Sequence, residues 1–305
     1  MRNRLGAIEE KLKHSRPLTR HLFFIAFLLA AVLVFIPSLR RMVNLSLSSE
    51  MYSHLLLIPF VSVYLLYINR EKLAAAPRPV NLPASMILLL AAFLLAAASF
   101  FVSDLSASVF LFVLLVWTGF VFFHGSAASR EVLFPLFFLV FLVPAPSALL
   151  ERIISFLLWG SDQVTAFLFS LSGVPFLHQD YVYRLPRLSI YIAPECSGIR
   201  SSTALLLTAV LADYLVLTRW WSRSILLLSV LPLAVFKNGL RIVTLSLLAI
   251  YVDAGFMSGK LHSRGGFVFF GITLAIMGIL LLLLRKSELF LASRKTTEEG
   301  RQEAE

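Results

Sequence analysis

Cysteine and charge are the two properties that this chain has little of. Cys196 is the single cysteine among 305 residues, which excludes an intramolecular disulfide and a cysteine-ligated metal cluster. Only 14% of the residues are charged, against roughly 25% in soluble domains. No two of the six histidines stand four residues apart, the spacing at which a helical zinc motif carries its two histidines beside a glutamate. We therefore expect no metal and no other cofactor.

Apolar residues are correspondingly frequent. They make up 59% of the chain, and 27 of them are phenylalanine. Apolar stretches of about 20 residues, long enough to cross a bilayer, recur along the whole length. This pattern predicts an all-α polytopic membrane protein, a single transmembrane domain over 1–305 with about eight transmembrane helices. The expected spans are 21–39, 51–68, 84–102, 105–123, 131–149, 199–217, 224–251 and 265–284.

Lysine and arginine collect in the connections between these spans. The net charge of +10 therefore follows the positive-inside rule, and we expect no nucleic acid as a partner. The basic segment 1–20 and the tail 285–305 should both be cytoplasmic, which places the long connection 150–198 on the outer side. We expect a multi-pass protein of the cytoplasmic (inner) membrane, in contact with membrane lipid, whose active site faces outward, toward the periplasm.

The outer connection has two parts. The part from Glu151 to Ser172 is apolar but interrupted by the polar run 160–163, which predicts a short interfacial helix, with a ninth span as the alternative. The part from Gln179 to Ala193 alternates β-branched and aromatic residues with polar ones, which predicts a β-hairpin turning near Pro186. This hairpin leads directly to the segment that holds Cys196.

The position of Cys196 favours reactivity. It lies just ahead of the apolar run that begins at Ile199, and the start of a helix lowers the pKa of a thiol. Backbone N–H groups around Ser197 and Gly198 could stabilise a developing oxyanion. Arg200 would share a helix face with Cys196 if one helix included both. The alternative is that Cys196 is simply a small buried apolar residue.

Lys237, Asn238 and Arg241 interrupt the span 224–251. An ionisable residue inside a membrane span indicates a functional site. Arg241 should lie about 27 Å from Arg223 along the helix, near the outer end of the span. The alternative is structural: the two cations extend to the membrane surface, or Arg241 pairs with an acidic residue such as Asp253 or Glu195.

His262 lies in the outer connection before the last span. By itself it would be an ordinary loop histidine. The predicted topology, however, places it on the same side as Cys196 and Arg241. A thiol, a histidine and an arginine together supply a nucleophile, a proton carrier and a fixed positive charge, which is what acyl transfer through a thioester requires.

These segments resemble the exosortase/archaeosortase family. The resemblance rests on Glu195-Cys196-Ser197-Gly198-Ile199-Arg200-Ser201, on Asn238-Gly239-Leu240-Arg241-Ile242 and on His262 before the final span. It implies a membrane-embedded cysteine endopeptidase or transpeptidase that cleaves C-terminal sorting signals of exported, membrane-anchored proteins. Cys196 would form the acyl-thioester, Arg241 would donate a proton or stabilise the oxyanion, and His262 would assist. A cell-surface glycan or lipid could be the acceptor.

Two other functions fit the composition. A transporter or a handler of lipid-linked glycans would bind an anionic headgroup with Arg200, Lys237 and Arg241. A non-catalytic scaffold for envelope polymer export would need neither the thiol nor the arginine. A transporter should tolerate Cys196→Ser and fail with Arg241→Ala, whereas an enzyme needs the thiol itself.

The charge pattern yields a prediction of topology. Reporter fusions within 1–20 and after 284 should report the cytoplasm, and fusions at 180–190 should report the outer side, because the basic connections stay inside. The measurement compares a reporter that is active only in the cytoplasm with one that is active only on the outer side. A C-terminus found outside would contradict the topology and separate His262 from Cys196.

Overall fold

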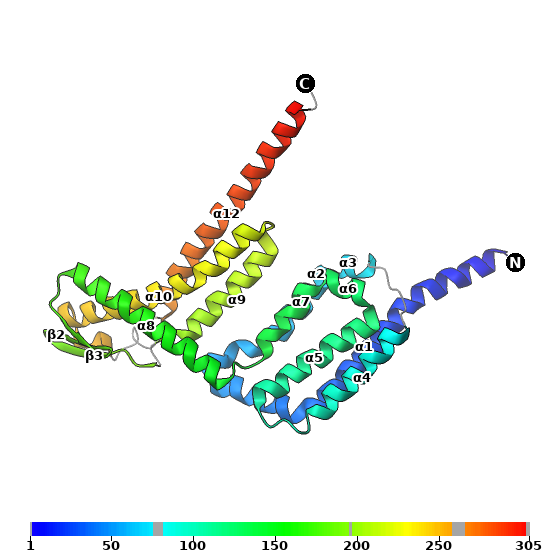
Figure 1. Ribbon diagram of the computed structural model, residues 1–305, viewed down its shortest axis with the longest axis horizontal. Coiled ribbons are helices and arrows are strands. Elements are labelled where there is room, and N and C mark those ends of the chain that lie inside the picture. Colours follow the sequence, from blue (N-terminus) through cyan, green and yellow to red (C-terminus); the bar gives the residue numbers. More distant parts are fainter. Residues whose placement is uncertain (1, 76–81, 195–196, 258–265, 303–305) are drawn as a thin grey trace. The chain divides into compact units, whose positions relative to one another are not determined.

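The computed structural model describes residues 2–75, 82–194, 197–257 and 266–302 (Figure 1). The chain divides into two compact units, which we call unit 1 (1–146) and unit 2 (147–305). Both are helical, and the three short strands that the structure describes belong to unit 2. The prediction that 1–305 is one transmembrane domain stays a prediction.

Unit 1 is an assembly of helices. The helix α5 packs between α1 and α4, where Phe35, Ala92 and Leu115 are buried against one another. Asp104 begins α5 because its carboxylate accepts the Ala107 N–H at 2.8 Å, an N-cap. The elements are α1 (Arg2–Ser48), η1 (Glu50–Leu56), α2 (Ile58–Ile68), α3 (Arg70–Ala75), α4 (Leu82–Ala98), α5 (Leu105–His124), α6 (Ser126–Glu131), α7 (Leu133–Phe138) and η2 (Leu139–Leu142).

Seven of the described helical segments are long and apolar enough to cross a membrane, so the chain is a multi-pass membrane protein. Six of them coincide with predicted spans, and the seventh, Ser147–Ser172, is the segment that we expected to lie in the interface. Two predicted spans, 84–102 and 131–149, hold only shorter apolar helices, Met86–Ala98 and Leu133–Leu142. Pro144 and Pro146 follow the second of these and prevent it from continuing as a helix.

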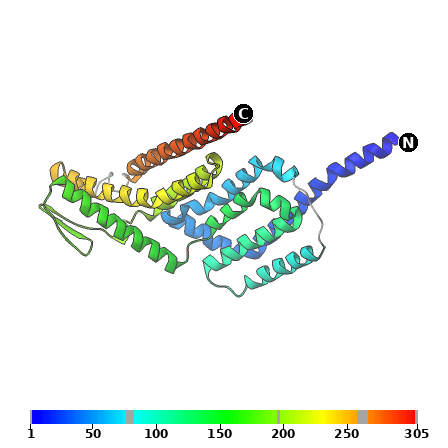
Figure 2. The same cartoon turned by 45° about the horizontal axis from the view of Figure 1, so that its top comes forward.

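Unit 2 is built around α10 (Trp220–Tyr251), which packs against α8 (Ser147–Ser172), α9 (Ile199–Val216) and α12 (Gly266–Gln302). The helices α9 and α10 form an antiparallel pair joined by a short turn, and α12 lies beside them (Figure 2). After Leu284 the chain continues as part of α12 as far as Gln302.

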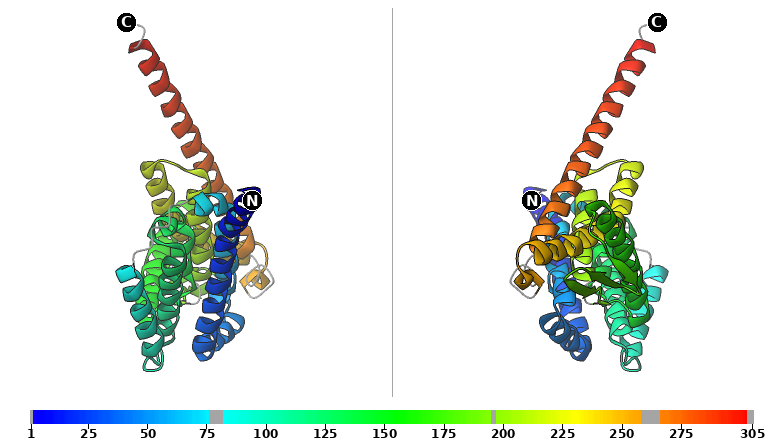
Figure 3. Two further views of the ribbon diagram at one scale, coloured as in Figure 1. Left: turned by 90° about the vertical axis from the view of Figure 1, so that its right-hand side faces the viewer. Right: turned by 90° about the vertical axis from the view of Figure 1, so that its left-hand side faces the viewer.

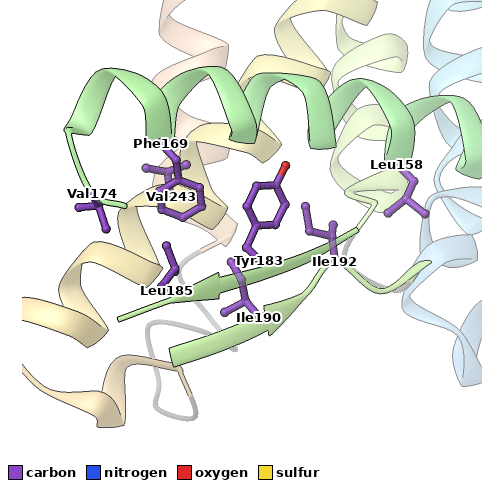
Figure 4. Close-up of a cluster of buried hydrophobic side chains, with 8 residues drawn as sticks. All are labelled: Leu158, Phe169, Val174, Tyr183, Leu185, Ile190, Ile192 and Val243. Atoms are coloured by element: carbon purple, nitrogen blue, oxygen red, sulfur yellow. The ribbon is translucent and has the colours of Figure 1, made fainter. Parts of the chain in front are cut away.

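Two hydrophobic clusters lie along α10. The first half of α10 packs with α9 and α12 through residues such as Leu205, Leu226 and Met277. The second half packs with α8 and the strands, where Val243, Phe169 and Tyr183 are buried (Figure 4). The residues between the two clusters are Lys237, Asn238 and Arg241. The predicted polar interruption of this helix is therefore the boundary between two packing environments.

The predicted hairpin is confirmed. β2 (Val182–Leu185) and β3 (Leu188–Tyr191) pair antiparallel, with Leu185 opposite Leu188 across the two-residue turn at Pro186 and Arg187. A third strand that we did not predict, β1 (Leu177–Gln179), pairs with β2. The strands lie beside α8 and the second half of α10 (Figure 3).

A buried carboxylate on α12 closes the turn between α9 and α10. Glu288 is only 3% exposed. It accepts the N–H of Thr218 at 3.1 Å and that of Arg219 at 2.8 Å, as well as the hydroxyls of Thr218 and Ser222. A carboxylate here also suits the positive end of the α10 dipole. Glu288 therefore acts as an N-cap supplied by another helix.

Replacing Glu288 with alanine should destabilise unit 2. The change leaves the N–H groups at the start of α10 without their acceptor, and hydrogen bonds to a charged group contribute about 1.5–3 kcal/mol. We expect a thermal unfolding midpoint in detergent several degrees below that of the unmodified protein. Ser287→Ala, at the adjacent, partly buried position, is the control. Equal midpoints for all three proteins would contradict the capping role.

Candidate active site

The site is described through the residues on either side of the predicted nucleophile. Cys196 and His262 lie outside the described residues. Ser197 and Gly198 follow Cys196 directly, and both are described. Ser197 is 1% exposed, and its N–H donates to the Pro194 C=O at 3.1 Å. That amide is therefore occupied by a turn, although we expected it to be open to an oxyanion.

Gly198 holds the start of α9 against α10. Its φ of +76° is a left-handed conformation that favours glycine. A Cβ at this position would also come within 3.1 Å of the Asn238 side-chain oxygen. The Cys196 segment therefore ends in close contact with the Asn-x-x-Arg segment of α10. Because Gly198 is not helical, α9 begins at Ile199 and includes Arg200. The helix face that we expected Arg200 to share with Cys196 involves a residue outside the described ones.

Asn238 connects this contact to α8. It is 1% exposed, and its amide nitrogen donates to the Ser161 hydroxyl at 3.0 Å. The approach is close because Gly239 comes next: a Cβ there would lie 2.6 Å from the Val164 side chain. Small residues allow membrane helices to approach in this way, and polar side chains then bond across the contact.

Lys237 is buried, which contradicts the alternative that it extends to the membrane surface. It is 4% exposed, and its ammonium group donates to the Ser201 hydroxyl. Ser201 in turn donates to the Gly198 C=O at 3.0 Å. A chain of hydrogen bonds therefore runs from the cation on α10 to the peptide group two residues after Cys196. It fixes the orientation of that peptide.

Arg241 lies one helical turn beyond Asn238 and is half-buried. Arg241 lies at the start of the half of α10 that packs against the strands. The helix extends for about another 15 Å beyond Arg241. Arg200, in the first turn of α9, is exposed. The structure thus brings Gly198, Asn238 and Lys237 together, with Arg241 next along the helix and Arg200 toward the surface.

A second polar cluster fixes the strands that lead to Cys196, and our sequence reasoning missed it. Asp162 on α8 is 4% exposed and lies 2.9 Å from His178 Nε2. The Tyr183 hydroxyl, which points toward α8 in Figure 4, donates to the same carboxylate at 2.8 Å. Burial raises the pKa of the Tyr183 phenol, and its bond to Asp162 acts in the same direction, so Tyr183 remains a donor. Asp162 thereby ties β1 and β2 to α8.

A signal for this cluster was present in the sequence. Asp162 belongs to the polar run that interrupts an otherwise apolar segment, and a carboxylate in such a segment indicates a partner. We interpreted the run as a break in an interfacial helix. Instead, the adjacent residues Ser161 and Asp162 hold the two sides of the Cys196 segment, one through Asn238 and the other through Tyr183 and His178.

The arrangement suits covalent chemistry on a carbonyl compound. Gly198, two residues after the only thiol, packs against Asn238 of α10, and the Lys237 ammonium from the same helix bonds to Ser201 nearby. Among the described residues, no group of three or more His, Cys, Asp and Glu side chains could hold a metal ion.

Comparison with known proteins gives one match. The profile of the family described as transmembrane exosortase matches residues 45–279, which is most of the chain. The comparisons with curated proteins and with solved structures give no match. The matched range contains all three features on which the resemblance rested, the two segments and His262, and the helical membrane fold agrees with the family's description. The chain therefore belongs to the transmembrane exosortase family.

Proposed function

We propose that this exosortase is a membrane-embedded cysteine endopeptidase, and a transpeptidase where an acceptor is present. It cleaves the C-terminal sorting signal of exported, membrane-anchored proteins at the outer face of the cytoplasmic membrane. Cys196 is the nucleophile, Arg241 stabilises the charge that develops on the substrate, and His262 carries the proton.

The observation that carries this proposal is the contact between Gly198 and Asn238. It joins two segments 40 residues apart, the one that holds the only thiol and the one that holds Arg241. A protein that used Arg241 only to bind an anionic headgroup would not need the thiol segment to be fixed there. The buried ammonium of Lys237 adds positive charge at the same place.

The reaction follows from these groups. The thiolate of Cys196 attacks the carbonyl carbon of the scissile peptide bond and forms a tetrahedral oxyanion, which the Arg241 guanidinium stabilises. Collapse of this intermediate breaks the C–N bond, and the leaving amine takes a proton that His262 supplies. An acyl-thioester remains. Arginine keeps its own proton at all relevant pH values, so we assign the proton transfer to His262.

The second half of the reaction resolves the thioester. Water gives hydrolysis, and an amine or hydroxyl of a cell-surface glycan or lipid gives transpeptidation. In both cases the acceptor adds to the acyl carbon, gives its proton to His262 and expels the Cys196 thiolate, so His262 regains the proton that it gave to the leaving amine. The enzyme therefore ends each cycle unchanged.

Removing the thiol should end the reaction. In cells that co-express a tagged exported reporter with a short motif, an apolar helix and a basic end at its C-terminus, the unmodified protein should produce a shortened product. Cys196→Ala should leave only the precursor. Arg241→Ala should slow cleavage on the order of 10²–10³-fold, which is the usual effect of losing one oxyanion donor. His262→Ala should also be severely impaired.

Arg70→Ala, at an exposed arginine of unit 1, is the matched control and should cleave normally. Immunoblotting of membrane fractions measures both product formation and enzyme level. Normal cleavage by Cys196→Ala at an unchanged enzyme level would rule out the enzyme and leave a transporter or a scaffold.

The reactivity of the thiol provides a second prediction. Cys196 should react with iodoacetamide near neutral pH faster than a free thiol of pKa about 8.5, because the positive charge near it favours the thiolate. Arg241→Ala should slow the reaction about threefold to tenfold, since one pKa unit corresponds to a tenfold change in thiolate fraction. The control is Arg184→Ala on the exposed face of β2. If the rates with and without Arg241 coincide across pH, Arg241 does not influence the thiol.

A further inference from the structure

The sheet of unit 2 has an open edge at β3. The Ile192 N–H donates to the Tyr181 C=O at 3.0 Å, and in an antiparallel pair the bonded positions alternate with unbonded ones. By this alternation Ile190 bonds to Tyr183, its partner in the register. Ser189 and Tyr191 lie between these positions. Their N–H and C=O groups therefore point away from β2, toward the other edge of β3.

This edge is accessible in the part of the chain that the structure describes. The strand order is β1-β2-β3, so no described strand covers β3, and no described hydrogen bond reaches the backbone of Ser189 or Tyr191. Both side chains are exposed, and Tyr191 is 60% exposed. An uncovered row of N–H and C=O groups is a template for another strand.

The edge belongs to a sheet that is anchored through its buried face, and it precedes Cys196 closely in the chain. The opposite side of β3 is buried through Ile190, and the sheet is tied to α8 by the bond from Tyr183 to Asp162. Cys196 is five positions after Tyr191, and an extended chain of this length reaches at most about 18 Å. A segment bound at Tyr191 would therefore lie no farther than about this distance from Cys196.

We propose that the β3 edge binds the substrate as an added strand. The occupant is the extended polypeptide segment of the exported protein beside its scissile bond, and its backbone pairs with Ser189 and Tyr191. Only an extended backbone offers donors and acceptors with the two-residue period that these groups present. This assignment rests on the proposed function and deepens it by naming where the substrate peptide is held.

A disulfide scan tests the proposal directly, because the chain has no other thiol once Cys196 is replaced. In a Cys196→Ala background, Ser189→Cys is combined with a reporter that carries one cysteine, moved stepwise through the segment before its apolar helix. Paired strands hold facing Cα atoms about 4.5–5.5 Å apart, which suits a disulfide. We expect cross-links at every second reporter position, because side chains alternate between the faces of a strand.

Two further variants sharpen the scan. Tyr191→Cys should give the same alternation displaced by two reporter positions, since Tyr191 is two residues from Ser189 on the same face. Arg184→Cys should give no cross-link: Arg184 faces Ser189 from β2 and lies one strand farther from the added strand.

Ser189→Pro in the active enzyme should lower kcat/KM about threefold to tenfold, because it removes one donor from the open edge.

The outcomes separate the two proposals. Cleavage of the cysteine-free reporter by the unmodified enzyme, with no cross-links or with cross-links at consecutive positions, overturns strand addition and leaves the proposed function standing. A cross-linked pair of enzyme chains formed by Ser189→Cys without reporter shows that a second copy covers the edge, and it also overturns the proposal. Absence of cleavage by the unmodified enzyme counts against the proposed function itself.

Discussion

The close approach of α8 and α10 at Gly239 is the constraint on which the rest of unit 2 depends. A side chain at this position would collide with Val164. The absence of one brings Asn238 within hydrogen-bonding distance of Ser161 and leaves space for Gly198 on the other side of Asn238. The Cys196 segment is thus positioned by the separation of two helices, and any change in that separation would move it.

The buried polar groups of unit 2 are arranged so that hydrogen bonds offset their desolvation. An ammonium, an amide and two carboxylates are nearly inaccessible to solvent at Lys237, Asn238, Asp162 and Glu288. Each bonds to a hydroxyl, a backbone group or an imidazole of another element. Hydrophobic packing supplies little specificity between helices in lipid, so these bonds determine which helix faces which. They also fix the register along α10, where one turn separates the contact with α9 from Arg241.

Patterns in the sequence were sufficient for the local elements. The alternation in 182–191 predicted the hairpin, and the polar interruption of 224–251 located the residues that contact Gly198. The partners of buried polar residues were not predictable, because they depend on which way a helix faces. Nothing local shows that Lys237 turns toward Ser201 or that Asp162 meets Tyr183. β1 was missed for a related reason: its three residues are exposed, and the turn before β2 uses Asp180 and Tyr181 at positive φ without a glycine to mark it.

The cap that Glu288 provides has a consequence for biosynthesis. The carboxylate is made 70 residues after Thr218, the turn residue that it binds. While the chain emerges, α9 and α10 can enter the membrane and pair, yet the N–H groups of Thr218 and Arg219, just before α10, lack their acceptor until the last helix is made. The Cys196 segment is thus synthesised before Glu288 can cap the turn between α9 and α10. Maturation of the thiol site is thereby coupled to the final step of synthesis, and a chain that stops early would be left with an open turn.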